Sequence, residues 1–342
     1  MSKHLIIRAD AHTKSGTGHV MRCLALAQAW KEKGGKVVFL SHCRSEALKK
    51  RIIGEGFDLI PIIKPHPDPS DLAQTLRVLR CHAPNFWFVL DGYEFSTEYQ
   101  RRIKEAGYQL LVIDDMAHLD HYFGDIILNQ NIYEEDSQYS CEPTTKLLLG
   151  TKYVLLRKEF SSWLGWKRII QKKARKVLVT MGGADPDNVT LKCIEAIENL
   201  NDPHIEVKVI IGPANTHKDV LVEAMLSMQC SVHCVENTMN MPKLMAWADL
   251  AISSAGSTCW EVLFMQLPAV VIILAENQKA IAEKLHRLGL AVNIGWHENS
   301  SSKMIMESVH RMSHDEQFRI DLVSRSRSTI DGLGAERLLR EL

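Results

Sequence analysis

A glycine-rich loop that ends in a histidine lies near the N-terminus and could carry chemistry. Gly16, Gly18 and His19 stand between an apolar run at residues 5–7 and a stretch at residues 23–30 with helical spacing of apolar residues. This order predicts a strand, a polar loop and a helix. Glycines let a ligand approach the backbone, and free N–H groups at a helix N-terminus attract anions. The positive helix end would favour the neutral, proton-accepting form of His19.

The same loop also has a structural interpretation, as a tight turn with a capping histidine. It is not a phosphate-binding P-loop, because no Gly-Lys-Ser/Thr follows it. It is not a dinucleotide fingerprint either, because the third glycine of that motif is missing. The local sequence therefore leaves the catalytic and the structural interpretation open.

Acidic residues follow two other apolar runs. Asp91 comes after residues 86–90, and Asp114 and Asp115 come after residues 109–113. Because the carboxyl ends of parallel strands meet at one edge of a sheet, we expect these side chains near the glycine loop. The Asp114-Asp115 pair could bind a metal or act in acid–base chemistry, but we favour capping and loop hydrogen bonds.

The second half of the chain repeats the pattern with another glycine pair. Gly182 and Gly183 follow the apolar run 176–180, so a phosphate or sugar could approach a backbone without side chains. Asp185 suits the N-cap of the next helix, and Pro186 suits its first residue.

A later strand of the second half ends in small residues, which are Ser254, Gly256, Ser257 and Thr258. A helix is expected to begin at about Ser257–Thr258, and free N–H groups there suit a diphosphate. Glu261, one turn into that helix, could accept hydrogen bonds from ribose hydroxyls. Alternatively, Glu261 only complements the helix dipole.

Asn277 and Gln278 follow the apolar run 269–274. Their amides carry both donors and acceptors, which suits sugar hydroxyls and acetamido groups.

The composition limits the class of protein. A chain of 342 residues with 46% hydrophobic and 24% charged residues predicts a globular protein of about two domains. Lys+Arg and Asp+Glu are both 41, so we expect neither a nucleic-acid partner nor a membrane partner. No apolar run reaches the roughly 18 residues of a membrane span, and we expect no signal peptide.

The cysteines indicate a reducing compartment. Eight cysteines in a chain of this length are too few for a disulfide scaffold, so we expect reduced, buried thiols in a cytoplasmic protein. Cys230, His233 and Cys234 lack a second ligand pair at zinc-finger spacing, so no metal site is expected there.

Strand-like and helical patterns alternate along the whole chain, which predicts parallel α/β units. Helical patterns occupy residues 45–53, 71–81 and 96–106, and strands are expected at residues 36–40, 59–63, 86–90, 109–113, 126–128, 176–180, 206–211, 231–235, 250–253 and 269–274. We expect two Rossmann-like domains with a cleft between them: an N-terminal domain at residues 1–155, a crossover at residues 156–175, and a C-terminal UDP-binding domain at residues 176–342. The last helix could pack on the N-terminal domain.

Taken together, the motifs resemble a known family. Two α/β halves with these loops look like the GT-B fold of nucleotide-sugar glycosyltransferases such as the MurG type. More narrowly, the chain resembles the UDP-2,4-diacetamido-2,4,6-trideoxy-β-L-altropyranose hydrolases of pseudaminic acid biosynthesis and related spore-coat polysaccharide proteins. The motifs that carry the resemblance, in order, are Arg8-x-Asp10, Gly16-x-Gly18-His19 with Arg22, Asp91-x-Tyr93, Asp114-Asp115, Leu149-Gly150-x-x-Tyr153, Arg157-x-Glu159-Phe160, Gly182-Gly183-x-Asp185, Ser254-Ala255-Gly256-Ser257 with Glu261, and Asn277-Gln278.

The resemblance implies that water cleaves the glycosidic C1–O bond of the UDP-sugar with inversion and that UDP is released. The family's catalytic histidine falls on His19, and Tyr93 matches a tyrosine of the sugar site. Trp260 stands where some members carry Asn, so the family's contacts from that position do not carry over. Because UDP is a good leaving group, no general acid with a raised pKa is needed. Helix N-termini would stabilise the departing diphosphate, so neither a metal nor a cofactor is expected.

We assign His19 as the base or water-orienting group, and Asp10 as a residue that orients His19 or the sugar. The residues expected to hold the sugar are Gly18, Arg22, Tyr93, Asn277 and Gln278. The residues expected to hold UDP are Gly16, Gly182, Gly183, Ser254, Gly256, Ser257, Thr258 and Glu261. The expected partner is a UDP-sugar, and a monomer is expected.

Two other functions remain open. A glycosyltransferase would pass the sugar to a lipid or polysaccharide acceptor, and a lipid acceptor should require a basic, apolar membrane patch in the first domain. The helical pattern at residues 45–53, with Arg44 and its neighbouring lysines, keeps this idea open. A non-catalytic sensor would bind the UDP-sugar without turnover.

Overall fold

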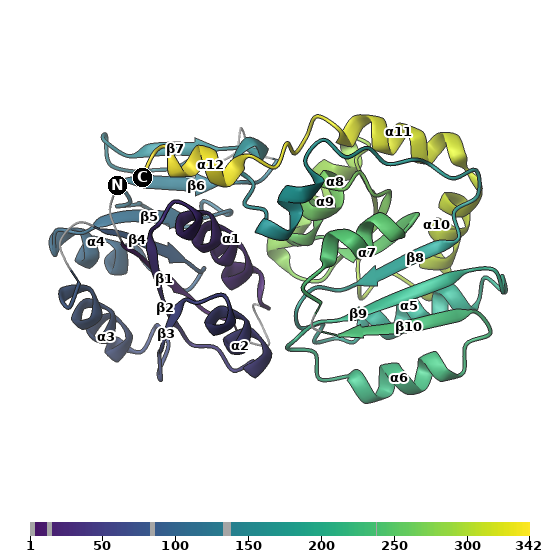
Figure 1. Ribbon diagram of the computed structural model, residues 1–342, viewed down its shortest axis with the longest axis horizontal. Coiled ribbons are helices and arrows are strands. Elements are labelled where there is room, and N and C mark those ends of the chain that lie inside the picture. The colour runs from purple at the N-terminus through teal and green to yellow at the C-terminus, as the bar shows by residue number, and fades with distance from the viewer. Residues whose placement is uncertain (1–3, 12–15, 83–85, 133–137, 237) are drawn as a thin grey trace. The chain divides into compact units, whose positions relative to one another are not determined.

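The computed structural model describes residues 4–11, 16–82, 86–132, 138–236 and 238–342. The chain divides into two compact units (Figure 1). Unit 1 comprises residues 1–158 and 332–342, and unit 2 comprises residues 159–331. Each unit is built on its own parallel sheet, as the alternating pattern predicts.

Unit 1 contains a seven-stranded parallel sheet in the order β3-β2-β1-β4-β5-β6-β7. Its strands are β1 (His4–Ala9), β2 (Lys36–Ser41), β3 (Asp58–Pro61), β4 (Phe86–Asp91), β5 (Gln109–Ile113), β6 (Ile126–Asn129) and β7 (Lys146–Leu149). Its helices are α1 (Gly18–Glu32), α2 (Glu46–Gly54), α3 (Pro69–Arg80), α4 (Thr97–Glu105), the short η2 (Thr151–Tyr153) and α12 (Gly334–Leu339).

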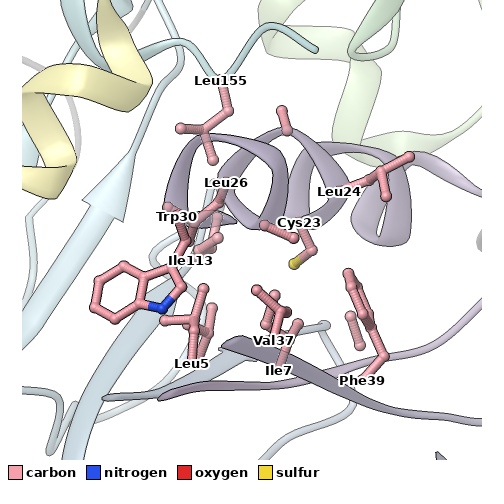
Figure 2. Packing of buried hydrophobic residues seen from close by; sticks show 14 of the residues in the cluster. Leu5, Ile7, Cys23, Leu24, Leu26, Trp30, Val37, Phe39, Ile113 and Leu155 are labelled. Atoms are coloured by element: carbon pink, nitrogen blue, oxygen red, sulfur yellow. The ribbon is translucent and has the colours of Figure 1, made fainter. Parts of the chain in front are cut away.

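Side chains of this sheet alternate between two buried faces. Leu5 and Ile7 of β1 pack beneath α1 with Val37 of β2, as Figure 2 shows. Ile6 of the same strand belongs to the opposite cluster, with Tyr99 of α4. Because both faces are covered, the strands read as continuous apolar runs, and this made them recognisable in the sequence.

The last helix belongs to unit 1 although it follows unit 2 in sequence. Leu338 and Leu339 are buried in the core beneath α1. Nε1 of Trp87 donates to the carbonyl of Leu342 at 2.8 Å. A Cβ on Gly334 would lie 2.2 Å from the carbonyl oxygen of Val154, so the helix starts where only glycine fits.

Unit 2 contains a six-stranded parallel sheet in the order β10-β9-β8-β11-β12-β13. Its strands are β8 (Lys176–Thr180), β9 (Glu206–Ile211), β10 (Ser231–Glu236), β11 (Leu250–Ser254), β12 (Ala269–Ile273) and β13 (Val292–Trp296). Its helices are α5 (Val189–Glu198), α6 (Lys218–Leu226), α7 (Met241–Trp247), α8 (Thr258–Phe264), α9 (Glu276–Arg287), α10 (Ser302–His314) and α11 (Glu316–Ser326); η3 (Lys158–Trp163) begins at the last residue of unit 1.

The start of α5 differs from the expectation. Asp185 is not the N-cap, and Pro186 is not the first helical residue, because Asp185 and Asn188 both have positive φ and the helix begins at Val189. The two carboxylate oxygens of Asp185 still accept hydrogen bonds from the N–H groups of Val189 and Thr190. Asp185 therefore satisfies the first free N–H groups of α5, although it lies three residues before the N-cap, Asn188.

The expectation of buried thiols is only partly right. All eight cysteines are free, and four are buried, but Cys81 and Cys234 are exposed. Among the described residues, none of the helices combines the length and the apolar character needed to cross a membrane.

Candidate active site

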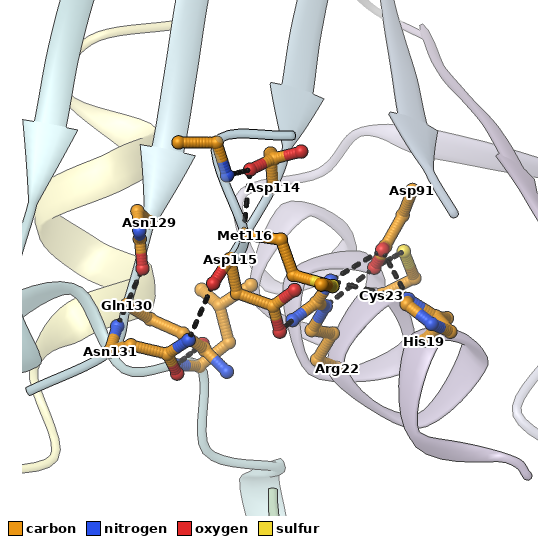
Figure 3. A network of polar contacts seen from close by, with 12 residues as sticks. His19, Arg22, Cys23, Asp91, Asp114, Asp115, Met116, Asn129, Gln130 and Asn131 are labelled. Carbon is orange, nitrogen blue, oxygen red and sulfur yellow. Dashed lines mark hydrogen bonds and ion pairs between the residues drawn. The ribbon is translucent and has the colours of Figure 1, made fainter. Parts of the chain in front are cut away.

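Four polar residues meet at the carboxyl edge of the unit 1 sheet, where β4 and β5 end beside the start of α1 (Figure 3). They are His19 and Arg22 of α1, Asp91 at the end of β4, and Asp115 just after β5. We call them the histidine cluster. All four residues are largely buried.

The carboxylate of Asp91 organises the histidine cluster. It is fully buried and accepts from Nδ1 of His19 at 2.6 Å. Arg22 donates to it twice, from Nε at 2.7 Å and from Nη2 at 2.6 Å. The thiol of Cys23 adds a weaker contact at 3.3 Å. Burial by itself would raise the pKa of Asp91, but Arg22 and His19 hold it well below its usual value.

The protonation of His19 differs from the expectation. Burial lowers its pKa, but the charge and hydrogen bond of Asp91 outweigh burial, and the pKa is raised. The charges explain this result, because two carboxylates, Asp91 and Asp115, face the single guanidinium of Arg22. The excess negative charge favours the imidazolium more than the helix dipole opposes it.

The contact with Asp91 also decides which imidazole nitrogen can react. Nδ1 lies against the carboxylate, so it carries the proton in neutral His19 and leaves Nε2 as the acceptor. Among the described residues, no hydrogen bond to Nε2 is found. The ring of Tyr93 stands edge-on to the imidazole, with centroids 4.7 Å apart. His19 can therefore hold or accept a proton at Nε2.

Asp10 does not contact His19. Arg8 donates to both of its carboxylate oxygens, and the backbone N–H of His42 donates to one of them at 2.6 Å. Arg8 is buried and also binds Asp71. Asp10 thus belongs to a buried ion-pair cluster, and Asp91 occupies the orienting position that the sequence suggested for Asp10.

Strand alternation explains this exchange of roles. Asp91 continues the face of Trp87 and Val89, which lies beneath α1. Asp10 continues the face of Ile6, which lies on the other side of the sheet. Because alternate residues of both strands are apolar on both faces, the sequence alone did not show which face lies beneath α1.

The Asp114-Asp115 pair is divided in the same way. Asp114 accepts from the backbone N–H groups of Met116 and Ala117 and from the hydroxyl of Tyr122. Asp115 accepts from Nη1 of Arg22 at 2.8 Å. The favoured interpretation, loop hydrogen bonding, fits Asp114, whereas Asp115 joins the histidine cluster. Among the described residues, no group of three or more His, Cys, Asp or Glu side chains is arranged to hold a metal ion.

In unit 2, several of the residues expected to bind UDP lie together at the carboxyl edge of the sheet. A Cβ on Gly256 would lie 3.5 Å from Nε2 of Gln278 and 3.9 Å from Oγ of Ser254. A Cβ on Gly182 would lie 3.5 Å from the same hydroxyl. We call Gly182, Ser254, Gly256 and Gln278 the glycine–serine edge; it leaves backbone accessible beside small polar groups.

Helix α8 begins at Thr258 after Ser257, as expected, and Glu261 lies half-buried in its first turn. Oε1 of Gln278 accepts from the backbone N–H of Leu274 at 3.0 Å, so that oxygen is committed to the protein. Trp260 is buried in unit 2.

Comparison of the chain with protein families and solved structures identifies the class of fold. Residues 176–330 match the family described as the glycosyltransferase family 28 C-terminal domain. The fold matches the crystal structure of Acinetobacter baumannii MurG with a TM-score of 0.68 at 14% identity, covering 99% of this chain and 99% of that one. The chain therefore has the fold of the GT-B glycosyltransferases, with two parallel-sheet α/β domains.

Three relatives are similar in sequence. An uncharacterized protein of Methanocaldococcus jannaschii is 26% identical over 283 residues, covering 80% of this chain, which spans only 56% of that relative. The spore coat polysaccharide biosynthesis protein SpsG of Bacillus subtilis is 23% identical over 337 residues, or 98% of this chain and 96% of SpsG. The UDP-2,4-diacetamido-2,4,6-trideoxy-beta-L-altropyranose hydrolase of Campylobacter jejuni is 23% identical over 295 residues, which cover 84% of this chain and 98% of that hydrolase.

Proposed function

We propose that the chain is an enzyme of glycan biosynthesis that acts on a UDP-sugar. More narrowly, it would hydrolyse UDP-2,4-diacetamido-2,4,6-trideoxy-β-L-altropyranose to UDP and the free sugar, with inversion. The observation that carries the proposal is the pairing of His19 with Asp91, which leaves Nε2 as a proton acceptor. The likeness to SpsG and to the hydrolase of Campylobacter jejuni supports it.

In the proposed step, the oxygen of a water attacks C1 of the sugar while the C1–O bond to the diphosphate breaks. The water proton passes to Nε2 of His19, and the electron pair of the broken bond leaves with UDP. Asp91 stabilises the imidazolium that forms. Because the diphosphate leaves as an anion, protonation of the leaving group is not required, and one displacement inverts C1.

Unit 2 would hold the UDP. The glycine–serine edge offers backbone N–H groups and hydroxyls to a diphosphate, and Glu261 offers a carboxylate to ribose hydroxyls. Tyr93, Arg22, Asn277 and Gln278 remain our candidates for the sugar. Arg22 would act through Asp91 and Asp115, because its guanidinium is already bound to both carboxylates.

One observation favours a second function. The match of residues 176–330 to a glycosyltransferase family is compatible with transfer of the sugar to an acceptor other than water. The same histidine would then take its proton from an acceptor hydroxyl.

One experiment separates these functions. The purified protein is incubated with the named UDP-sugar without any acceptor, and NMR follows UDP release and the anomer first formed. Rapid release of the inverted α-anomer supports hydrolysis. Turnover that needs an added acceptor supports the transferase. Tight binding without turnover supports a non-catalytic sensor. UDP-N-acetylglucosamine in a parallel reaction tests whether the enzyme distinguishes the sugar.

A further inference from the structure

A pocket of about 780 Å³ lies in unit 2, away from the residues assigned to UDP. Lys176 and Glu206, the first residues of β8 and β9, line it. The pocket therefore opens at the N-terminal ends of the parallel strands, whereas the glycine–serine edge lies at their C-terminal ends. The other side of the pocket is formed by the end of α7, including Trp247.

The pocket is strongly basic. Residues 161–176 contain six Lys or Arg residues and no Asp or Glu, although the whole chain has a net charge of zero. All six of these cations line the pocket, and its acidic lining residues within the described part of the chain are Glu206 and Asp249. One carboxylate oxygen of Asp249 is already bound to the backbone N–H groups of Arg175 and Lys176.

Three of the cations are free to bind a ligand. Among the described residues, the side chains of Lys167, Lys172 and Arg175 have no ion-pair or hydrogen-bond partner. Lys173 differs, because it pairs with Asp202 at 3.1 Å. Arg168 differs as well, because it is buried and donates to the backbone carbonyls of Met245 in α7, Ala248 just after α7 and Met265 just after α8.

The same segment exposes large apolar side chains. Ile169 is 82% exposed and lies between Lys167 and Lys172 in sequence, and Leu164, which precedes Lys167 by three residues, is 46% exposed. We call Leu164, Lys167, Ile169, Lys172 and Arg175 the basic surface. Exposed aliphatic side chains cost free energy in water, and combined with unpaired cations they suit the interface of an anionic bilayer.

The segment is also held in a fixed conformation. Arg319 of α11 is buried and donates from Nη2 to the carbonyls of Gln171 and Lys172 at 2.6 and 3.2 Å. Gln266 donates to the carbonyl of Trp166 at 3.0 Å. Because the backbone is already ordered, docking would cost little conformational entropy.

We propose that the basic surface docks unit 2 on an anionic lipid membrane. The free cations would meet lipid phosphates, and Ile169 and Leu164 would enter the headgroup region. This inference goes beyond the proposed function and does not depend on it. The zero net charge led us to expect no membrane partner, but the charge is unevenly distributed over the chain.

The test is co-sedimentation of the full chain with vesicles of phosphatidylcholine alone and of phosphatidylcholine mixed with phosphatidylglycerol, over a series of salt concentrations. We expect binding only to the anionic vesicles and weaker binding as salt rises. The triple variant Lys167→Glu, Lys172→Glu, Arg175→Glu should bind roughly a hundredfold more weakly. Ile169→Asp should weaken binding even at high salt, where the charge contribution is screened.

The matched control carries the same charge change on exposed residues of unit 2 outside the basic surface, Lys218→Glu, Arg287→Glu and Lys303→Glu. Thermal melting checks that both triple variants are folded. Equal binding by the two triple variants, or no binding to anionic vesicles at low salt, would overturn the proposal. So would binding of inorganic tripolyphosphate without vesicle binding, because the ligand would then be a soluble polyanion.

Discussion

Nδ1 of His19 lies 2.6 Å from Oδ1 of Asp91, and the same carboxylate accepts two hydrogen bonds from Arg22. The imidazole is thereby fixed in one orientation and one tautomer. Because Arg22 is itself shared with Asp115, the charge felt by His19 depends on residues from three separate segments.

The first prediction concerns the pH dependence of activity. If neutral His19 is the base, kcat/KM rises with pH through the pKa of His19 in the free enzyme and then reaches a plateau. Because that pKa is raised, the rise should lie above the usual value of about 6.5. Asp91→Asn removes the main raising cause, so the rise should move to lower pH. Asp115→Asn should move it in the same direction, but less.

Asp10→Asn is the matched control for the pH profile. It alters an equally buried aspartate at the end of the neighbouring strand, which binds Arg8 instead of His19. The pH profile of this variant should keep its midpoint. A shift equal to that of Asp91→Asn would contradict the assignment of Asp91 as the orienting residue.

The second prediction concerns His19 itself. His19→Ala should lower kcat by on the order of a hundredfold or more, because the proton acceptor is lost. The affinity for UDP, measured by calorimetry, should remain within about twofold, since the expected UDP contacts lie mostly in unit 2. His82→Ala, which removes a partly exposed histidine of unit 1, serves as the control. An equal loss of UDP binding in His19→Ala would mean that His19 only supports the loop.

The third prediction concerns stability. Arg8 is buried between Asp10 and Asp71, so Arg8→Met would leave two buried carboxylates without their cation. We expect a loss of about 3–5 kcal/mol in the free energy of opening of unit 1, measured by hydrogen exchange of its core peptides. Arg101→Met is the control, because Arg101 also pairs with two carboxylates but is exposed. Its loss should stay below about 1 kcal/mol.

The fourth prediction concerns the glycine–serine edge. Gly256→Val should place a branched side chain beside Ser254 and Gln278, where we expect the diphosphate. UDP binding should weaken roughly tenfold, or by about 1.4 kcal/mol, while the melting temperature changes little. Gly54→Val, at the end of a helix in unit 1 with no heavy atom within 4 Å of the added Cβ, is the matched control. Unchanged UDP affinity in Gly256→Val would place the nucleotide elsewhere.

Much of the fold was predictable because buried parallel strands appear as unbroken apolar runs. The strands of residues 86–90 and 109–113 were recognised in this way. The edge strands β7 and β13 were not predicted, although the edge strands β3 and β10 were. Strand β7 has only four residues, and Asn293 and Gly295 interrupt the apolar residues of β13. The predicted start of α5 was wrong because Asp185 and Asn188 take positive φ, a conformation that Asp and Asn adopt more often than most residues but that the sequence does not require.

The candidate site was predictable only in part. His19 could be recognised because its loop and helix are contiguous in sequence. Its partner could not be chosen between Asp10 and Asp91 without the strand order, since both end strands that lie side by side in the sheet. The basic surface was visible as a Trp-, Lys- and Arg-rich stretch, but which cations are already paired depends on residues distant in sequence, such as Asp202.

The position of α12 has a consequence for synthesis. Leu338, Leu339 and the carbonyl of Leu342 complete the core of unit 1, yet they are translated after every residue of unit 2. On the ribosome, the first 158 residues must wait with that part of their apolar core uncovered until the last turn of helix emerges. A fragment ending at Lys158 would keep the histidine cluster in its sequence but lack the segment that closes the core beneath α1.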